Sequence, residues 1–201
     1  MRVEFRCADL QLEGDLLIPP ECRRGAVICH PHPQYGGDMD NAVVCAVTTA
    51  LHHSGLATLR FNFRGAGASQ GAYANGIGEV EDVRAAVRFL VERSAVRSLT
   101  LAGYSFGAMV VLRAWQDVAA VDRLIAVAPP LAFFDLTNLA SCSAQKLFIL
   151  GDHDQYCSVA QLTEQLRHVA DPKAHRIVGG ADHFFAGAEE PLAEAVRAFA
   201  S

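Results

Sequence analysis

The chain has 201 residues, 51% of them hydrophobic, and a formal net charge of -5. This length and apolar content predict one globular domain, 1–201, built around a single large core. Lysines and arginines are scattered along the chain, so neither nucleic acid nor a membrane is expected as a partner. No apolar run approaches the roughly 20 residues that span a bilayer, and MRVEFRCADL lacks a signal-peptide core, so we expect a cytoplasmic protein.

The expected elements alternate between strand and helix. Period-2 patterns in VEFRCADL and QLEGDLLIP indicate an opening antiparallel pair. Short apolar runs typical of buried strands follow at 26–30, 56–63, 98–104, 123–129, 146–151 and 173–179. Amphipathic or apolar stretches typical of helices lie between and after them, at 40–53, 76–93, 106–115 and 189–200. This alternation predicts an α/β fold with a mostly parallel sheet covered by helices on both faces.

The chain has six cysteines, and no two of them are spaced as CxxC. Cys29 and Cys45 lie inside apolar segments, as buried free thiols commonly do. We therefore expect reduced thiols rather than a disulfide framework.

One hydroxyl lies between two glycines where a predicted strand meets a predicted helix. The motif GYSFG places Gly103 and Gly107 two residues either side of Ser105. So tight a reversal strains the central residue and brings backbone close to the flanking positions, where glycine fits. It would lift Ser105 above the sheet edge at a helix N-terminus, which favours negative charge. We predict that Ser105 is a nucleophile; an ordinary glycine-rich turn is the alternative.

A serine nucleophile needs a base and an orienting carboxylate, which in such a turn follow in the order acid, then histidine. Loops after two later strands offer GDHD and GGADHFF. His183 is the expected base. His52 and His53 lie at a predicted helix end, His168 late in a further expected helix and His175 inside a predicted strand, and His153 precedes the acid. Asp152 directly follows the strand and is expected to bond nearby backbone. Asp154 can reach the next loop, so it is the expected acid.

The oxyanion of an acyl-transfer reaction needs hydrogen-bond donors, and two backbone amides are expected to supply them. One is the amide of Phe106, directly after Ser105. The other lies in HPHPQYGGDMDN, where the prolines lack an N–H group and leave the amides of His32 and Gln34. His32 is preferred to Gln34; alternatively, HPHP only shapes the loop.

Five motifs together resemble the α/β-hydrolase superfamily, in particular small bacterial hydrolases close to its dienelactone-hydrolase-like members. The motifs are HPHPQYGGDMDN, RFNFRGAGASQG, GYSFG, GDHD and GADHFF, and the similarity covers nearly the whole chain. The resemblance implies the α/β-hydrolase fold, with a twisted, mostly parallel eight-stranded sheet and a triad of Ser105, Asp154 and His183. Because a triad generates its nucleophile by proton transfer alone, no metal or other cofactor is expected.

Two features depart from the family. Dienelactone hydrolases proper use a cysteine where this chain has Ser105, so their substrate is not carried over. The loop reads HPHP where many lipases have an HGGG-type sequence, which leaves the second oxyanion donor open between His32 and Gln34.

The superfamily usually inserts a cap after the sixth strand, but the segment 129–145 is too short for a helical lid. No cap domain and an open site are therefore expected. Leu131, Phe133 and Phe134 are the expected apolar wall for the substrate, unless they pack the loop onto the core. An exposed apolar rim would also suit a second copy of the chain, so a homodimer is a further expectation.

These residues predict a serine hydrolase that cleaves small-molecule carboxylic esters or thioesters through an acyl-enzyme. Three alternatives stay open. The same triad could transfer the acyl group to another acceptor, as an acyltransferase does, or the chain could be a noncatalytic α/β-hydrolase used as a binding module. A metal-dependent hydrolase would leave Ser105 and His183 without a role; its candidate ligands are His30, His32, Asp152, His153 and Asp154.

Overall fold

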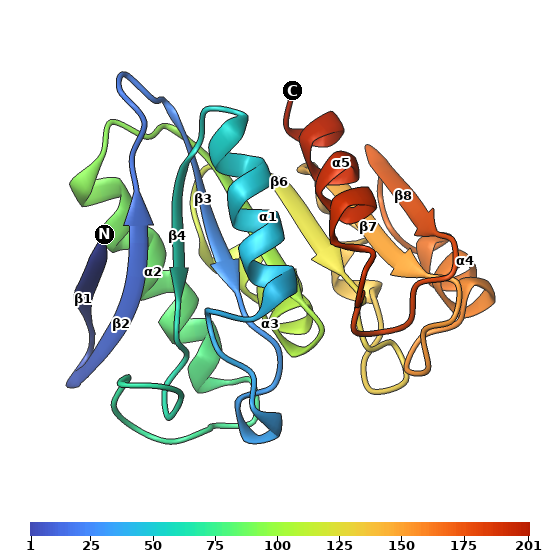
Figure 1. Ribbon diagram of the computed structural model, residues 1–201, viewed down its shortest axis with the longest axis horizontal. Helices are drawn as coiled ribbons and strands as arrows, with labels where there is room; N and C mark the ends of the chain where they lie inside the picture. Colours follow the sequence, from blue (N-terminus) through green and yellow to red (C-terminus); the bar gives the residue numbers. More distant parts are fainter.

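The computed structural model describes residues 1–201 and contains an eight-stranded sheet in the order β1-β2-β4-β3-β5-β6-β7-β8. β2 pairs antiparallel with both β1 and β4, and every other neighbouring pair is parallel. The sheet is twisted, with β1 at one edge and β8 at the other (Figure 1). The strands are β1 (Arg2–Cys7), β2 (Leu10–Leu17), β3 (Arg24–Cys29), β4 (Ala57–Phe61), β5 (Ser98–Tyr104), β6 (Val121–Val127), β7 (Gln145–Gly151) and β8 (Lys173–Val178).

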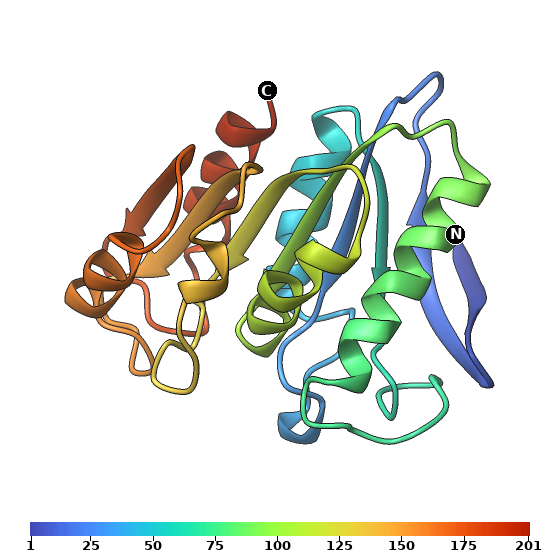
Figure 2. The ribbon, with the colours of Figure 1, turned by 180° about the vertical axis from the view of Figure 1, so that it is seen from behind.

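Helices cover both faces of the sheet. α1 and α5 pack together on one face (Figure 1), and α2 and α3 pack together on the other (Figure 2). Two buried clusters result: one joins α1 and α5 to the sheet, and a larger one joins α2, α3 and α4 to it. The helices are α1 (Ala42–His53), α2 (Gly78–Arg93), α3 (Phe106–Ala114), α4 (Val159–Leu166) and α5 (Glu189–Ala200), with short 3-10 turns η1 (Pro33–Tyr35), η2 (Trp115–Asp117) and η3 (Thr137–Leu139).

The burial of each strand follows its place in the sheet. β2, near the edge, alternates between buried and partly exposed positions. β3 and β5 are central, and every residue after the first is buried because helices cover both faces. These are the period-2 and continuous apolar patterns of the sequence, and the predicted fold class is confirmed.

Several elements are shorter than predicted, and for β4 and α2 the structure shows the physical cause. β4 ends at Phe61 rather than at residue 63, because the amide of Phe63 donates to the ring of His30 instead of to a neighbouring strand. α2 begins at Gly78 rather than at residue 76, because Asn75 and Gly76 have φ values of 57° and 79°, outside the helical region.

The segment between β6 and β7 contains one 3-10 turn, η3, and no helical cap stands over the sheet edge. All six cysteines are free, and five of them, including Cys29, are buried. Cys45, also expected in the core, is only partly buried, and its Sγ atom accepts a hydrogen bond from Arg60. None of the helices combines the length and the apolar character needed to cross a bilayer.

Candidate active site

The loops at the carboxyl ends of the parallel strands carry the predicted site residues, along the lower edge of the sheet in Figure 1. β5 leads into Ser105, β7 into Asp154, β8 into His183 and β3 into His32. Because parallel strands all end on the same side of a sheet, residues far apart in the sequence can meet there.

Ser105 occupies a strained turn between β5 and α3. Its backbone angles are φ 54° and ψ -116°, a conformation that residues with a side chain seldom adopt. A Cβ atom on Gly103 would lie 2.2 Å from the carbonyl oxygen of Gly107, and one on Gly107 would lie 2.4 Å from that of Cys29. Both positions therefore require glycine, and the turn leaves Ser105 partly exposed at the start of α3.

His183 lies between Ser105 and Asp154. Its Nε2 atom is 2.9 Å from Oγ of Ser105, and its Nδ1 atom is 2.8 Å from Oδ2 of Asp154. An ionised carboxylate can only accept, so Nδ1 carries the proton and Nε2 is left to accept from the serine hydroxyl. The side chains of His183 and Asp154 are 6% and 0% exposed, so water competes little for these bonds.

The two neighbouring aspartates have different partners. Asp154 accepts hydrogen bonds from two amides of its own loop through Oδ1, at 2.8 and 3.0 Å, and presents Oδ2 to His183. Asp152, whose side chain is 41% exposed, accepts a hydrogen bond from the amide of Gly180 at 2.7 Å. The structure thus places Asp154 beside the imidazole and Asp152 on loop backbone.

The loop that carries His183 is fixed by contacts that the sequence did not indicate. The hydroxyl of Tyr104 donates to the carbonyl oxygen of His183 at 3.0 Å, and the His183 amide donates to the side chain of Gln155 at 3.3 Å. Burial raises the pKa of Tyr104 above its usual range, so its hydroxyl remains a donor even in alkaline solution. A Cβ atom on Gly151 would lie 2.1 Å from the carbonyl oxygen of Ala181, so the loops after β7 and β8 are in direct backbone contact.

The loop after β3 places His32 and Gln34 differently. The amide of Gln34 donates to Nδ1 of His32 at 3.2 Å, whereas the amide of His32 donates to no acceptor in the protein. Phe106 is the first residue of α3, where helix amides lack an intrahelical acceptor. The ring centroids of His32 and Phe106 are 4.9 Å apart, so the two residues are neighbours.

His30 is fully buried and lies outside this hydrogen-bonded chain. Its Nδ1 atom donates to the carbonyl oxygen of Pro31 at 2.6 Å, and its Nε2 atom accepts from the amide of Phe63 at 3.0 Å. Burial lowers the pKa of His30 to about 4, so the ring is neutral at pH 7. His30 therefore ties the loop after β3 to the chain that follows β4.

Aromatic side chains that the sequence analysis missed surround the site. The rings of Tyr156 and Phe184 have centroids 4.6 and 5.6 Å from that of His183. On the other side, the ring of Tyr73 lies 4.6 Å from that of His32. Tyr156 lies two residues after GDHD and Phe184 lies within GADHFF, so both could have been found by that proximity, but Tyr73 has no such signal.

The three residues predicted as an apolar wall have different surroundings. Leu131 is 5% exposed and belongs to the core, and Phe134 packs against the same cluster. Phe133 is 72% exposed, and its ring lies 6.5 Å from that of Tyr156. Leu131 and Phe134 therefore anchor the loop to the core, the second possibility raised from the sequence, and Phe133 alone of the three stands at the rim.

The candidate metal ligands do not come together. No group of three or more His, Cys, Asp or Glu side chains could hold a metal ion. His30 and His32 are bonded to loop backbone, and Asp154 faces His183. The metal-dependent alternative therefore lacks a ligand set.

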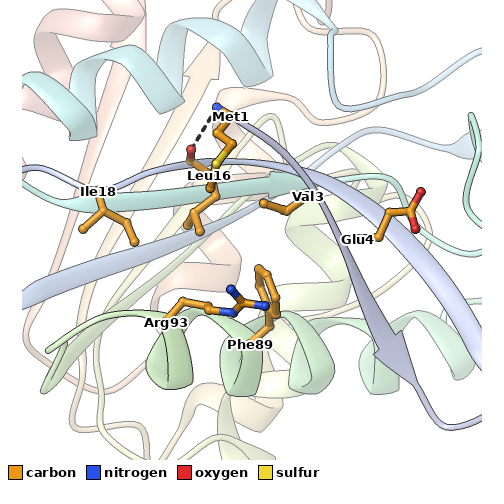
Figure 3. Close-up of a pocket in the computed structure, with 7 residues that line it drawn as sticks. All are labelled: Met1, Val3, Glu4, Leu16, Ile18, Phe89 and Arg93. Atoms are coloured by element: carbon orange, nitrogen blue, oxygen red, sulfur yellow. Dashed lines mark hydrogen bonds between the residues drawn. The ribbon is translucent and has the colours of Figure 1, made fainter.

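Three surface hollows, of about 310, 420 and 400 Å³, are lined by other parts of the chain and include none of Ser105, Asp154 and His183. The first lies between the β1–β2 pair and α2 (Figure 3). It presents no serine, cysteine or histidine, and its lining residues are Met1, Val3, Glu4, Leu16, Ile18, Phe89 and Arg93.

Comparison with known proteins agrees with the fold. Residues 27–147 match the family model described as serine aminopeptidase, S33, a hydrolase family. The chain belongs to this family, within the α/β-hydrolase superfamily, and the predicted superfamily is confirmed.

Several relatives are similar over most of their length. An alpha-beta serine hydrolase homologue from Coxiella burnetii is 35% identical, with a TM-score of 0.92 over 100% of this chain and 97% of its own. A serine hydrolase without a lid from Xanthomonas campestris is 30% identical, with a TM-score of 0.86 over 98% of this chain and 92% of its own. An uncharacterized protein of Rickettsia prowazekii is 33% identical over 181 residues, 86% of this chain and 76% of the relative.

Proposed function

We propose that this hydrolase uses Ser105 as a nucleophile to cleave small-molecule carboxylic esters or thioesters through an acyl-enzyme. The observation that carries the proposal is the unbroken hydrogen-bonded chain from Ser105 through His183 to Asp154. A serine hydroxyl is a weak nucleophile at neutral pH and needs such a base, itself oriented by a third group.

In the first step Oγ of Ser105 attacks the carbonyl carbon while Nε2 of His183 takes the hydroxyl proton. Asp154 holds the Nδ1–H tautomer and stabilises the imidazolium that forms. The leaving alcohol or thiol departs with the proton from His183. Water then repeats the attack on the acyl-enzyme, with His183 again as base, and restores the Ser105 hydroxyl.

The oxyanion of each tetrahedral intermediate is held by the amides of Phe106 and His32 in this proposal. The Phe106 amide points from the N-terminus of α3, where the helix dipole favours negative charge. Two facts support His32 over Gln34: the His32 amide has no acceptor within the protein, and the Gln34 amide is already bonded to the His32 ring.

The surroundings of Ser105 favour small esters or thioesters with an apolar part. Phe133, Tyr156 and Phe184 are 72%, 42% and 59% exposed around the base, and they offer apolar contact area without a cap. Alcohols and thiols are also better leaving groups than amines, so less binding energy is needed to expel them.

A fluorophosphonate probe tests the nucleophile directly. The purified protein should be labelled, and Ser105→Ala should lose both labelling and ester hydrolysis while its circular dichroism spectrum is unchanged. Ser141→Ala, at an exposed serine, is the matched control and should keep both. Labelling that persists in Ser105→Ala would refute the assignment.

A substrate panel tests the reaction class. It should contain aryl and alkyl esters, acyl thioesters and, because of the description of the family model, aminoacyl anilides. Hydrolysis of esters or thioesters is expected, and cleavage of the anilides alone would contradict the proposal. Product analysis with added alcohols or thiols would show whether acyl transfer to these acceptors competes with hydrolysis.

A further inference from the structure

Glu79 is a buried carboxylate whose charge contributes to the raised pKa of Arg64, although the two side chains do not form an ion pair. It lies in the first turn of α2, is 0% exposed and forms none of the ion pairs of the chain. Its Oε1 atom accepts a hydrogen bond from the amide of Ala74 and its Oε2 atom one from the amide of Gly76, both at 2.8 Å. A buried carboxylate is costly unless it is hydrogen-bonded, and the two amides and the N-terminus of α2 supply that compensation.

The backbone that Glu79 holds has an unusual conformation. Asn75 and Gly76 have φ values of 57° and 79°, so two successive residues are left-handed. This conformation is unfavourable for a residue with a side chain and persists where neighbouring groups enforce it. The two bonds to Glu79 bracket the bend and thereby fix the direction of the chain at Tyr73, the residue before Ala74.

Tyr73 packs on both residues whose amides we assign to the oxyanion. Its ring centroid is 4.6 Å from that of His32 and 5.7 Å from that of Phe106. The leaving group must lie on the side of His183, which protonates it, and the carbonyl oxygen must face the two amides. The acyl group then occupies the remaining side, next to the wall that Tyr73 forms.

The charge of Glu79 does not account for its position. The charge of Glu79 acts on Tyr73 and His32. The pKa of Tyr73 is raised, first by burial and then by this charge. Burial lowers the pKa of His32, and the charge of Glu79 opposes that effect. A negative charge raises the energy of a nearby developing oxyanion, so an electrostatic role would slow the reaction. The useful contribution of Glu79 is therefore the geometry that it enforces.

We propose that Glu79 is a positioning residue that holds Tyr73 against His32 and Phe106, so that Tyr73 limits the size of the acyl group that the site accepts. This inference rests on the proposed function. Neither side chain takes part in the chemical step. Tyr73 shapes the site, and Glu79 acts through Tyr73.

The test compares 4-nitrophenyl acetate with 4-nitrophenyl benzoate, which share a leaving group and differ only in the acyl group. The measured quantity is the ratio of kcat/KM for benzoate to that for acetate. Tyr73→Ala should raise this ratio about tenfold, the scale on which pocket contacts discriminate substrates. Glu79→Gln should shift it in the same direction, because its amide group cannot accept from both backbone amides. The double variant should match Tyr73→Ala alone.

Two further variants separate position from charge. Glu79→Asp keeps the charge but is too short to bond both amides, so it should shift the ratio as Glu79→Gln does. If it behaves like the native enzyme while Glu79→Gln does not, the charge is responsible and the proposal is wrong. Glu81→Gln, at an exposed position in the same helical turn, is the matched control and should leave the ratio unchanged.

The remaining outcomes are also decisive. Glu79 variants that lower the melting temperature and keep the native ratio would show a merely structural role. An unchanged ratio in Tyr73→Ala overturns the proposal even if the Glu79 variants fail to fold. A native protein that hydrolyses neither ester and resists the fluorophosphonate overturns the proposed function together with this inference. If the native protein is active but the benzoate-to-acetate ratio is the same in the Tyr73 and Glu79 variants, only this inference is overturned.

Discussion

Acid should destabilise the protein through His30 before most carboxylates titrate. His30 is fully buried, and its Nε2 atom accepts from the amide of Phe63. A proton on Nε2 would face the N–H group of Phe63, so that two donors meet. It would also create a buried positive charge that no ion pair compensates. The folded protein therefore resists protonation of His30, and burial lowers the pKa from 6.5 to about 4.

The size of the effect follows from this pKa difference. Well above pH 6.5 the ring is neutral in both states, so His30 gives no pH dependence there. As the pH falls from 6.5 to 4, only the unfolded chain gains the proton, and the free energy of unfolding decreases. A pKa lowered from 6.5 to about 4 corresponds to a loss of about 3 kcal/mol over this interval.

Urea unfolding between pH 7.5 and 4 measures this loss. His30→Gln supplies one donor and one acceptor without titrating, so its free energy of unfolding should fall by about 3 kcal/mol less than that of the native protein. His53→Gln, at an exposed position of α1, corrects for the removal of one histidine. Should His30→Gln not fold, the NMR titration of the His30 ring gives the folded-state pKa directly.

Equal pH dependence in the native protein and in His30→Gln would refute the reasoning, and so would an NMR midpoint for His30 near 6.5. Either result would mean that water or a rearranged partner reaches the ring, and that His30 does not tie the two loops together as described.

Further predictions concern the turn, the acid and the absence of a metal requirement. In urea unfolding, the free energy of unfolding of Ser105→Gly should exceed that of Ser105→Ala by about 1 to 2 kcal/mol, because glycine relieves the strain at φ 54°. Equal stability of the two variants would contradict this. Asp154→Asn should slow acylation by up to about 10⁴, as in the serine-protease precedent, whereas Asp152→Asn should lower mainly the melting temperature. A folded Asp154→Asn enzyme with near-native acylation would reverse that assignment. Exhaustive chelation should leave the rate unchanged, since proton transfer generates the nucleophile, and stoichiometric zinc needed for activity would show otherwise.

Much of the fold could be predicted because its signals are local. Central strands such as β3 and β5 are buried on both faces and therefore appear as continuous apolar runs, and β2 alternates because it lies near the edge of the sheet. The ends of elements were less predictable. β4 stops at Phe61 because a side chain distant in sequence, His30, accepts the hydrogen bond of the Phe63 amide.

Two histidines of one motif show where local patterns fail. In HPHP, His30 and His32 have almost the same neighbours in sequence, yet His30 lies in the core and His32 lies beside Phe106. Which way each ring points depends on what β4 and α3 place opposite it, and no short stretch of sequence contains that information.

The sequence by itself determined the alternation of strands and helices, the tight turn at Ser105, and the order in which Ser105, Asp154 and His183 follow their strands, since each is written in a short run of residues. Only the tertiary structure decided which contacts form across the sheet edge. It placed Leu131 in the core and brought Tyr73, through the bend held by Glu79, onto His32. Such contacts join loops that are distant in sequence, and their geometry is set by how helices and strands pack beneath them.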